Sequence, residues 1–186
     1  MPLLREEPAF YPAHLFDQVV QSTTQCSSWC VMHTRPRQEK SLARALHKAE
    51  ISFYLPLIVR HLRFRGRSMK SFRPLFDGYV FVLADNDERV AALSTGHVAQ
   101  ILDVVEQDRL THDLRRIAQL IASGAAITPE DRFGPGTRVI VRSGPFEGLT
   151  GTIIREASKR RFIVQVDFLQ KGASALLDDD VLVTQV

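Results

Sequence analysis

The glycine spacing of residues 136–151 constrains the fold of this chain more than any other feature. An apolar run leads into a Gly-Pro turn, an aromatic residue and two further glycines, which are Gly144, Pro145, Phe146, Gly148 and Gly151. Glycines spaced in this way suit corners with positive φ and places where two backbones approach closely. Such corners are typical of a very small closed barrel. We therefore expect a small β-barrel near the C-terminus.

The rest of the C-terminal region carries strand signals only. Short β-branched and apolar runs follow one another at residues 139–141, 152–155, 162–168, 175–177 and 181–183. Five short strands within about fifty residues are typical of an SH3-like barrel.

The preceding region alternates strand and helix patterns. Strand patterns occupy residues 29–33, 51–59, 79–83 and 98–105, and helical patterns occupy 37–49, 88–94 and a segment capped by Thr111 and closed by Gly124. We predict an α+β protein in four parts: an N-terminal arm (1–27), an α+β domain (28–122), a linker (123–133) and the barrel (134–186). The arm is either poorly ordered or a clasp against the domain.

Positive charge is concentrated in one segment. The net charge is only +3, yet residues 51–76 contain no Asp or Glu. The cations of that segment are Arg60, Arg63, Arg65, Arg67, Lys70 and Arg73, and Gly66 among them is the expected turn of a hairpin. A basic segment of this length indicates either a polyanionic partner or simply a well-solvated hairpin.

Residues suited to catalysis or metal binding form no recognisable set. The six histidines have no HExxH spacing, and no GxSxG or phosphate-binding loop occurs. Cys26 and Cys30 lack two further zinc ligands, which favours reduced thiols. The sequence shows neither a membrane-spanning apolar run nor a signal-peptide pattern. We expect a cytoplasmic binding protein without enzymatic activity, metal or cofactor.

Aromatic residues gather around Gly78. Phe76 precedes it, and Tyr79 and Phe81 follow it on one face of a strand. These side chains are either core residues or a partly exposed apolar depression of the kind that binds a protein partner.

Three ordered motifs resemble the NusG family of transcription elongation factors. Residues 136–151 resemble its KOW motif, and the segments WCVMHTRPRQEK (29–40) and LFDGYVFV (75–82) resemble strands and a helix of its N-terminal domain. The similarity runs collinearly over residues 28–186. Leu55-Pro56, the Arg-Gly-Arg hairpin and the approach to Gly78 resemble the specialised RfaH-like branch. The resemblance implies a NusG N-terminal-type α/β sandwich with an antiparallel sheet, followed by an SH3-like KOW barrel.

The resemblance also implies a function in transcription. In this family the N-terminal domain binds the clamp helices of bacterial RNA polymerase and suppresses pausing or termination. The apolar seat for those helices matches His33, Phe76, Tyr79 and Phe81. Cys30 and His33 stand where aromatics are common, and Asp77 stands where proline is usual. These departures imply a weaker clamp contact, or one tuned to a different polymerase surface. One hypothesis for residues 1–27 is that they mask this seat.

A second implied contact is with nucleic acid. In the RfaH-like branch a basic face touches the non-template DNA strand, and the matching residues are Arg35, Lys40, Arg44, Lys48, Arg63, Arg65 and Arg67. Phosphate contacts supply affinity without sequence choice, which would need a pocket for a base. No such pocket can be identified from the sequence.

The KOW barrel of this family binds Rho or a ribosomal protein. Phe168 and Leu169 match that contact, although barrel core explains them equally well. Two alternative functions stay open: a general NusG acting with Rho, and a free-standing KOW-type module that binds nascent or structured RNA. In each case we expect a monomer that does not associate with membranes.

Overall fold

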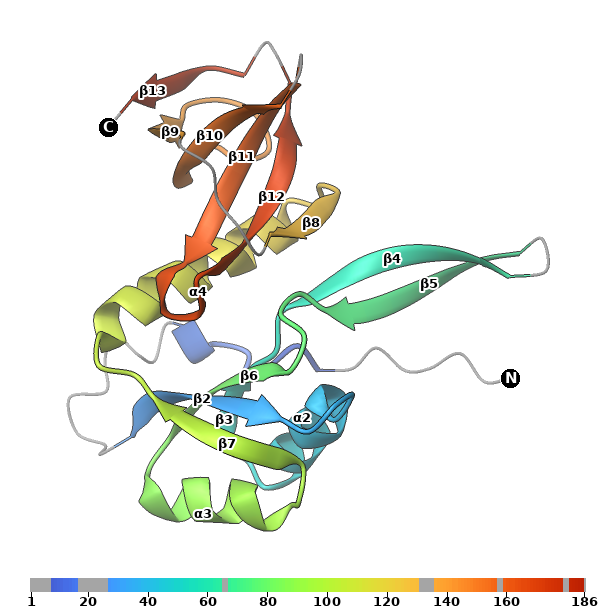
Figure 1. Cartoon of the computed structure of the whole chain (residues 1–186), viewed down its shortest axis with the longest axis vertical. Coiled ribbons are helices and arrows are strands. Elements are labelled where there is room, and N and C mark those ends of the chain that lie inside the picture. The colour runs from blue at the N-terminus through green and yellow to red at the C-terminus, as the bar shows by residue number, and fades with distance from the viewer. Residues whose placement is uncertain are drawn as a thin grey trace. The chain divides into compact units, whose positions relative to one another are not determined.

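The computed structural model describes residues 8–16, 27–64, 67–130, 136–156, 159–178 and 181–185 (Figure 1). They fall into two compact units, Met1–Gln107 and Asp108–Val186. Helices accompany antiparallel sheets in this chain, so the expected mixture of α and antiparallel β structure is confirmed.

The first unit is built on a five-stranded sheet. Its strands, in spatial order, are β1 (Phe10–Tyr11), β3 (Ser52–Tyr54), β6 (Tyr79–Ala84), β2 (Ser28–Thr34) and β7 (Val98–Asp103). Every neighbouring pair is antiparallel. The central strands β2 and β6 are buried along most of their length.

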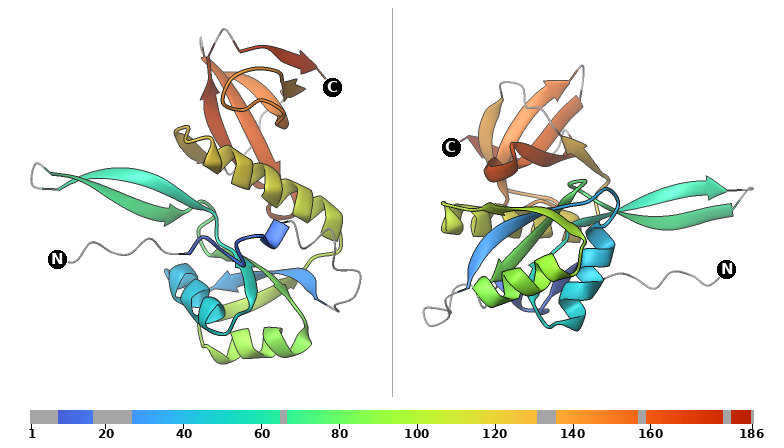
Figure 2. Two further views of the ribbon diagram at one scale, coloured as in Figure 1. Left: turned by 180° about the vertical axis from the view of Figure 1, so that it is seen from behind. Right: turned by 60° about the horizontal axis from the view of Figure 1, so that its bottom comes forward.

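Two helices pack on one face of this sheet (Figure 2). Helix α2 (Glu39–Lys48) buries Leu42, Ala43 and Leu46 against the strands. Helix α3 (Asn86–Ser94) begins at a capping box, in which Asp85 accepts a hydrogen bond from the Glu88 N–H at 2.9 Å. Both predicted helices are confirmed, with α2 starting two residues later than expected.

The core between sheet and helices contains the free thiol of Cys30. Burial raises the pKa of Cys30 to about 11, so the thiol is protonated and unreactive at neutral pH. Cys26 lies outside the described residues.

The expected basic hairpin is a two-stranded ribbon of its own (Figure 1). Strand β4 (Leu57–Phe64) pairs with β5 (Arg67–Pro74), and Phe64 lies opposite Arg67. The predicted turn residue, Gly66, falls between them and outside the described residues. The two paired strands confirm the hairpin.

The second unit combines a helix with a six-stranded antiparallel sheet. The helix is α4 (Gln107–Ala122), and the strands in spatial order are β13 (Val183–Gln185), β9 (Thr137–Val141), β10 (Thr150–Glu156), β11 (Lys159–Val166), β12 (Lys171–Leu177) and β8 (Ile127–Glu130). Four of the five predicted strands are present where expected, and the fifth, predicted at 181–183, lies two residues later as β13. Strand β8 lies within the segment predicted as a linker. The prediction that Thr111 caps the helix is wrong, because the helix already starts at Gln107.

Glycines fit the corners of this sheet in both expected ways. Gly144 and Gly148 each have a φ of 83°. A Cβ on Gly151 would lie 2.5 Å from the Ile163 carbonyl oxygen and 2.5 Å from the Phe162 ring, so only glycine fits between these strands.

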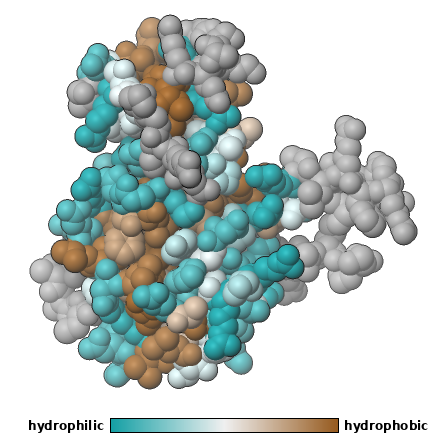
Figure 3. Space-filling model, in the orientation of Figure 1, coloured by the Kyte–Doolittle hydropathy of each residue, from teal (hydrophilic) through white to brown (hydrophobic). Residues whose placement is uncertain are grey.

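Some apolar side chains of the first unit reach the surface over β7 and α3 (Figure 3). Val90 and Leu93 are exposed on α3, and Val105 is exposed just after β7.

Candidate nucleic-acid interface and aromatic surface

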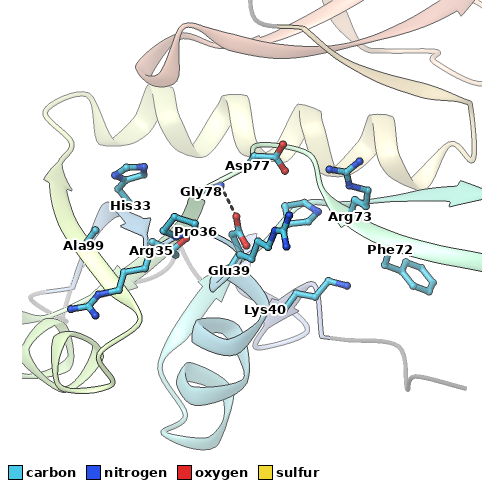
Figure 4. Close-up of a pocket in the computed structure, with 13 residues that line it drawn as sticks. His33, Arg35, Pro36, Glu39, Lys40, Phe72, Arg73, Asp77, Gly78 and Ala99 are labelled. Carbon is cyan, nitrogen blue, oxygen red and sulfur yellow. Dashed lines mark hydrogen bonds between the residues drawn. The ribbon is translucent and has the colours of Figure 1, made fainter. Parts of the chain in front are cut away.

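A pocket of about 730 Å³ opens in the first unit (Figure 4). It lies where β2 ends, α2 begins and the hairpin returns to the sheet. Its lining consists of His33, Thr34, Arg35, Pro36, Arg37, Glu39, Lys40, Phe72, Arg73, Pro74, Asp77, Gly78 and Ala99.

The pocket combines positive charge with aromatic rings. Four of its residues are cations, which are Arg35, Arg37, Lys40 and Arg73, against the carboxylates of Glu39 and Asp77. The three arginines are exposed, and the rings of His33 and Phe72 are half-buried. Cations can bind phosphates, and the parts of the two rings that solvent reaches can contact a base, so this lining suits single-stranded nucleic acid.

Glu39 connects the start of α2 to the turn at Gly78, and both line the pocket. Its side chain is 8% exposed, and Oε1 accepts a hydrogen bond from the Gly78 N–H at 2.8 Å. The Gly78 carbonyl in turn accepts from the Thr34 N–H at 2.8 Å. Gly78 has a φ of 84°, and a Cβ there would lie 3.3 Å from Nε2 of His33. The start of α2, the end of β2 and the glycine turn are therefore fixed to one another.

Of the cations and rings that line the pocket, Arg37, Phe72 and Arg73 were not predicted as site residues. Arg37 begins the helical pattern predicted over residues 37–49, but it precedes α2 with a φ of 62°, a left-handed conformation that is uncommon outside glycine. Phe72 and Arg73 lie in β5, where their position depends on the register that sets Arg73 opposite Ile58. The acid-free run signalled the charge of Arg73, but no sequence signal gave its place in the pocket.

The predicted nucleic-acid residues divide into three groups. Arg35 and Lys40 line the pocket. Arg44 and Lys48 are exposed and follow Lys40 at four-residue intervals, on the same side of α2. Arg63 and Arg67 lie on the paired strands of the hairpin, and Arg65 lies outside the described residues.

The four residues of the predicted seat share one face of the sheet, and we call them the aromatic surface: His33, Phe76, Tyr79 and Phe81. His33 lies opposite Tyr79 in the sheet, with ring centroids 5.1 Å apart. Phe76 meets Phe81 edge to face at 6.0 Å. Met32 and Val80 point into the helix-covered core, so their neighbours His33 and Phe81 point to the opposite face.

Exposure separates the aromatic surface into two pairs. Phe76 and Phe81 are 2% and 0% exposed, whereas His33 and Tyr79 are half-buried. The first pair is therefore packed as core, and the second pair is the part that solvent reaches.

In the second unit, the two residues proposed for partner binding follow β11. Phe168 and Leu169 belong to a 3-10 turn, η1 (Asp167–Leu169), and Phe168 is 38% exposed. The strand predicted to extend to Phe168 ends earlier, at Val166.

No group of three His, Cys, Asp or Glu that could hold a metal occurs within the described part of the chain. No helix among the described residues is long and apolar enough to cross a membrane.

The family model described as "Transcription termination factor nusG" matches residues 27–120, which is half of the chain and includes the pocket and the aromatic surface. The chain belongs to the NusG family. No curated protein matches this NusG-family chain significantly. A similar solved structure is "Domain interaction in Thermotoga maritima NusG", with 19% identity, 81% of this chain and 93% of that chain covered, and a TM-score of 0.45.

Proposed function

We propose that this chain is a specialised, RfaH-like elongation or antitermination factor without enzymatic activity, acting in the cytoplasm. It binds the clamp helices of bacterial RNA polymerase through the aromatic surface and single-stranded nucleic acid through the pocket. The observation that carries this proposal is the pocket itself, which joins four cations to two ring faces in a NusG-family domain.

The pocket is proposed to take one base of the non-template DNA strand. Its volume of about 730 Å³ lies within the range of small-ligand sites. The base stacks on His33 or Phe72, while Arg35, Lys40 and Arg73 contact neighbouring phosphates. A stacked or captured base supplies the sequence choice that phosphate contacts lack.

For the second unit we propose an SH3-like KOW barrel that recruits Rho or a ribosomal protein. Six antiparallel strands and the close approach at Gly151 support this architecture. The exposure of Phe168 supports its role as a contact.

Neutralising the pocket should weaken binding to single-stranded DNA. We expect Arg35→Gln/Arg73→Gln to reduce the slope of log affinity against log salt by about 1.4, because two phosphate contacts are lost at roughly 0.7 each. Fluorescence anisotropy with a labelled single strand measures this, and Arg142→Gln, an exposed cation of the second unit, is the matched control. An unchanged salt slope would remove the pocket from the interface. Stronger binding to structured RNA than to DNA would favour the RNA-binding alternative.

Truncating Tyr79 should weaken binding to the polymerase. Phe76 and Phe81 are unsuitable for this test, since removing a buried Phe costs about 3–5 kcal/mol of stability. Tyr79 is half-buried, and Tyr79→Ala should lower affinity for an elongation complex at least about tenfold if it is a contact hot spot. Val105→Ala is the exposed control. Equal binding by Tyr79→Ala and the native chain would place the polymerase contact elsewhere.

A further inference from the structure

Residues 8–16 of the N-terminal arm, called the arm below, lie on the same sheet face as the aromatic surface. Strand β1 extends the sheet at β3, with Phe10 opposite Tyr54, and the Leu55 N–H donates to the Ala9 carbonyl at 2.6 Å. The chain then turns, since the Leu15 N–H donates to the Pro12 carbonyl at 3.0 Å. Figures 1 and 2 show the turn (blue) on the side of the sheet opposite α3. Of the alternatives for the arm, a clasp describes residues 8–16.

Ring contacts connect this arm to the aromatic surface. Phe16 meets Tyr54 edge to face at 5.2 Å and 81°. Tyr54 lies opposite Phe81 in the sheet, with ring centroids 6.4 Å apart, and Phe81 meets Phe76. A continuous row of rings therefore runs from the arm to Phe76, and Tyr54 within it is only 2% exposed.

The arm places apolar side chains of a short helical turn against the sheet, as a helical binding partner would. Leu15 and Phe16 are in helical conformation, Leu15 is 0% exposed, and Phe16 is half-buried. A helical partner binds an apolar surface through side chains spaced along one face. The arm and a polymerase helix therefore offer this sheet face the same chemistry.

The backbone attachment of the arm is small. Strand β1 contains two residues, and Phe10 within it is 42% exposed. On the other side of the sheet edge, Tyr11 adds one ring contact with His47 at 5.1 Å. A two-residue strand supplies few backbone hydrogen bonds, so its pairing opens at lower free-energy cost than the pairing of the central strands.

We propose that residues 8–16 and the polymerase clamp helices are alternative occupants of this sheet face, so that the arm must leave before the polymerase binds. This inference rests on the proposed function. If the arm blocks binding, only molecules with an undocked arm can bind the polymerase. The apparent association constant then equals the intrinsic constant multiplied by the undocked fraction.

Weakening the arm should raise affinity for the polymerase in the full-length chain. The edge-to-face contact between Phe16 and Tyr54 stabilises the docked arm. Phe16→Ala removes this contact and should therefore tighten binding to an elongation complex about three- to tenfold. Ala13→Ser, an exposed position of the same turn, is the control and should bind like the native chain. Circular dichroism and thermal unfolding verify that both variants are folded.

Hydrogen exchange on the native chain provides a second measurement that needs no variant. Polymerase binding should speed exchange of the Leu55 amide, because that N–H loses its acceptor in the arm.

The outcomes separate the two proposals. Tighter binding by Phe16→Ala, together with faster exchange at Leu55, supports the inference. Unchanged or weaker binding by a folded Phe16→Ala, or an unchanged Leu55 amide, overturns it while leaving the polymerase contact intact. Failure of the native chain and both variants to bind polymerase overturns the proposed function, and this inference falls with it.

Discussion

Asp113→Ala should destabilise the second unit by about 3–5 kcal/mol. Asp113 is 4% exposed on α4, where it accepts a hydrogen bond from the Asp167 N–H at 3.1 Å and lies 3.5 Å from the Arg116 guanidinium. Arg116 also donates to the Thr150 carbonyl, and Arg109 pairs with Asp167. Removing the carboxylate takes the nearer counter-charge from a largely buried guanidinium, which keeps only the weaker attraction of Asp167, and takes from the Asp167 N–H its acceptor on Asp113.

The pKa shifts show that the pair itself is not strongly favourable, so the expected loss comes from leaving its buried partners unpaired. Burial raises the pKa of Asp113 and lowers the pKa of Arg116, so desolvation outweighs the attraction in both. The folded unit therefore favours the protonated Asp113 carboxyl: the resulting stability is complete below the unfolded-state pKa and is lost as pH rises through the folded pKa. Removing both charges should cost less than removing one.

Hydrogen exchange of β10 and β11 amides measures the stability of the second unit. Intrinsic Trp and Tyr fluorescence would report on the first unit instead, because Trp29 and all three tyrosines, at 11, 54 and 79, belong to it. Asp108→Ala, at an exposed site on the same helix, should change stability by less than about 0.5 kcal/mol. Asp113→Ala/Arg116→Met should recover part of the loss. If Asp113→Ala behaved like Asp108→Ala, the ionic contacts of α4 would contribute nothing.

Gly151→Ala should cost about 3 kcal/mol, the upper part of the usual overpacking range. The added methyl group would lie 2.5 Å from a backbone oxygen of Ile163, and 2.5 Å from the ring of Phe162. Phe162 is 0% exposed and stacks on Phe146 at 5.9 Å, so it has little room to move. Denaturant-dependent exchange of the same strands provides the measurement.

Gly148→Ala is the matched control for this prediction. Gly148 has a φ of 83° but no atom within 4 Å of an added Cβ, so the substitution carries only the left-handed backbone penalty of about 1–2 kcal/mol. Equal losses at both positions would mean that backbone conformation, and not close approach, explains the glycine at 151.

Local patterns predicted much of the fold. The strands around Gly144 and Gly151, and the two helices of the first unit, follow from apolar periodicity and glycine spacing, which depend on neighbouring residues only. Strand β1 was missed because two residues are too short to show a period.

The pocket could not be predicted in the same way. It joins the end of β2, the start of α2 and the end of β5, and its shape depends on the left-handed Arg37 and on the hairpin register. Alternation correctly placed Tyr79 and Phe81 on one face. What covers that face is a tertiary property, and so the burial of Phe76 and Phe81 required the structure.

Helix α4 determines where this chain can be divided. The family match continues to residue 120, yet Asp108–Val186 forms the second compact unit, tied internally by Asp113, Arg116 and Asp167. Dividing the chain at residue 123 would separate α4 from the residues of the second unit that its Asp113 and Arg116 contact. Domain exchange between relatives should therefore join the halves just before Asp108, so that each recombinant protein keeps helix and sheet from the same parent.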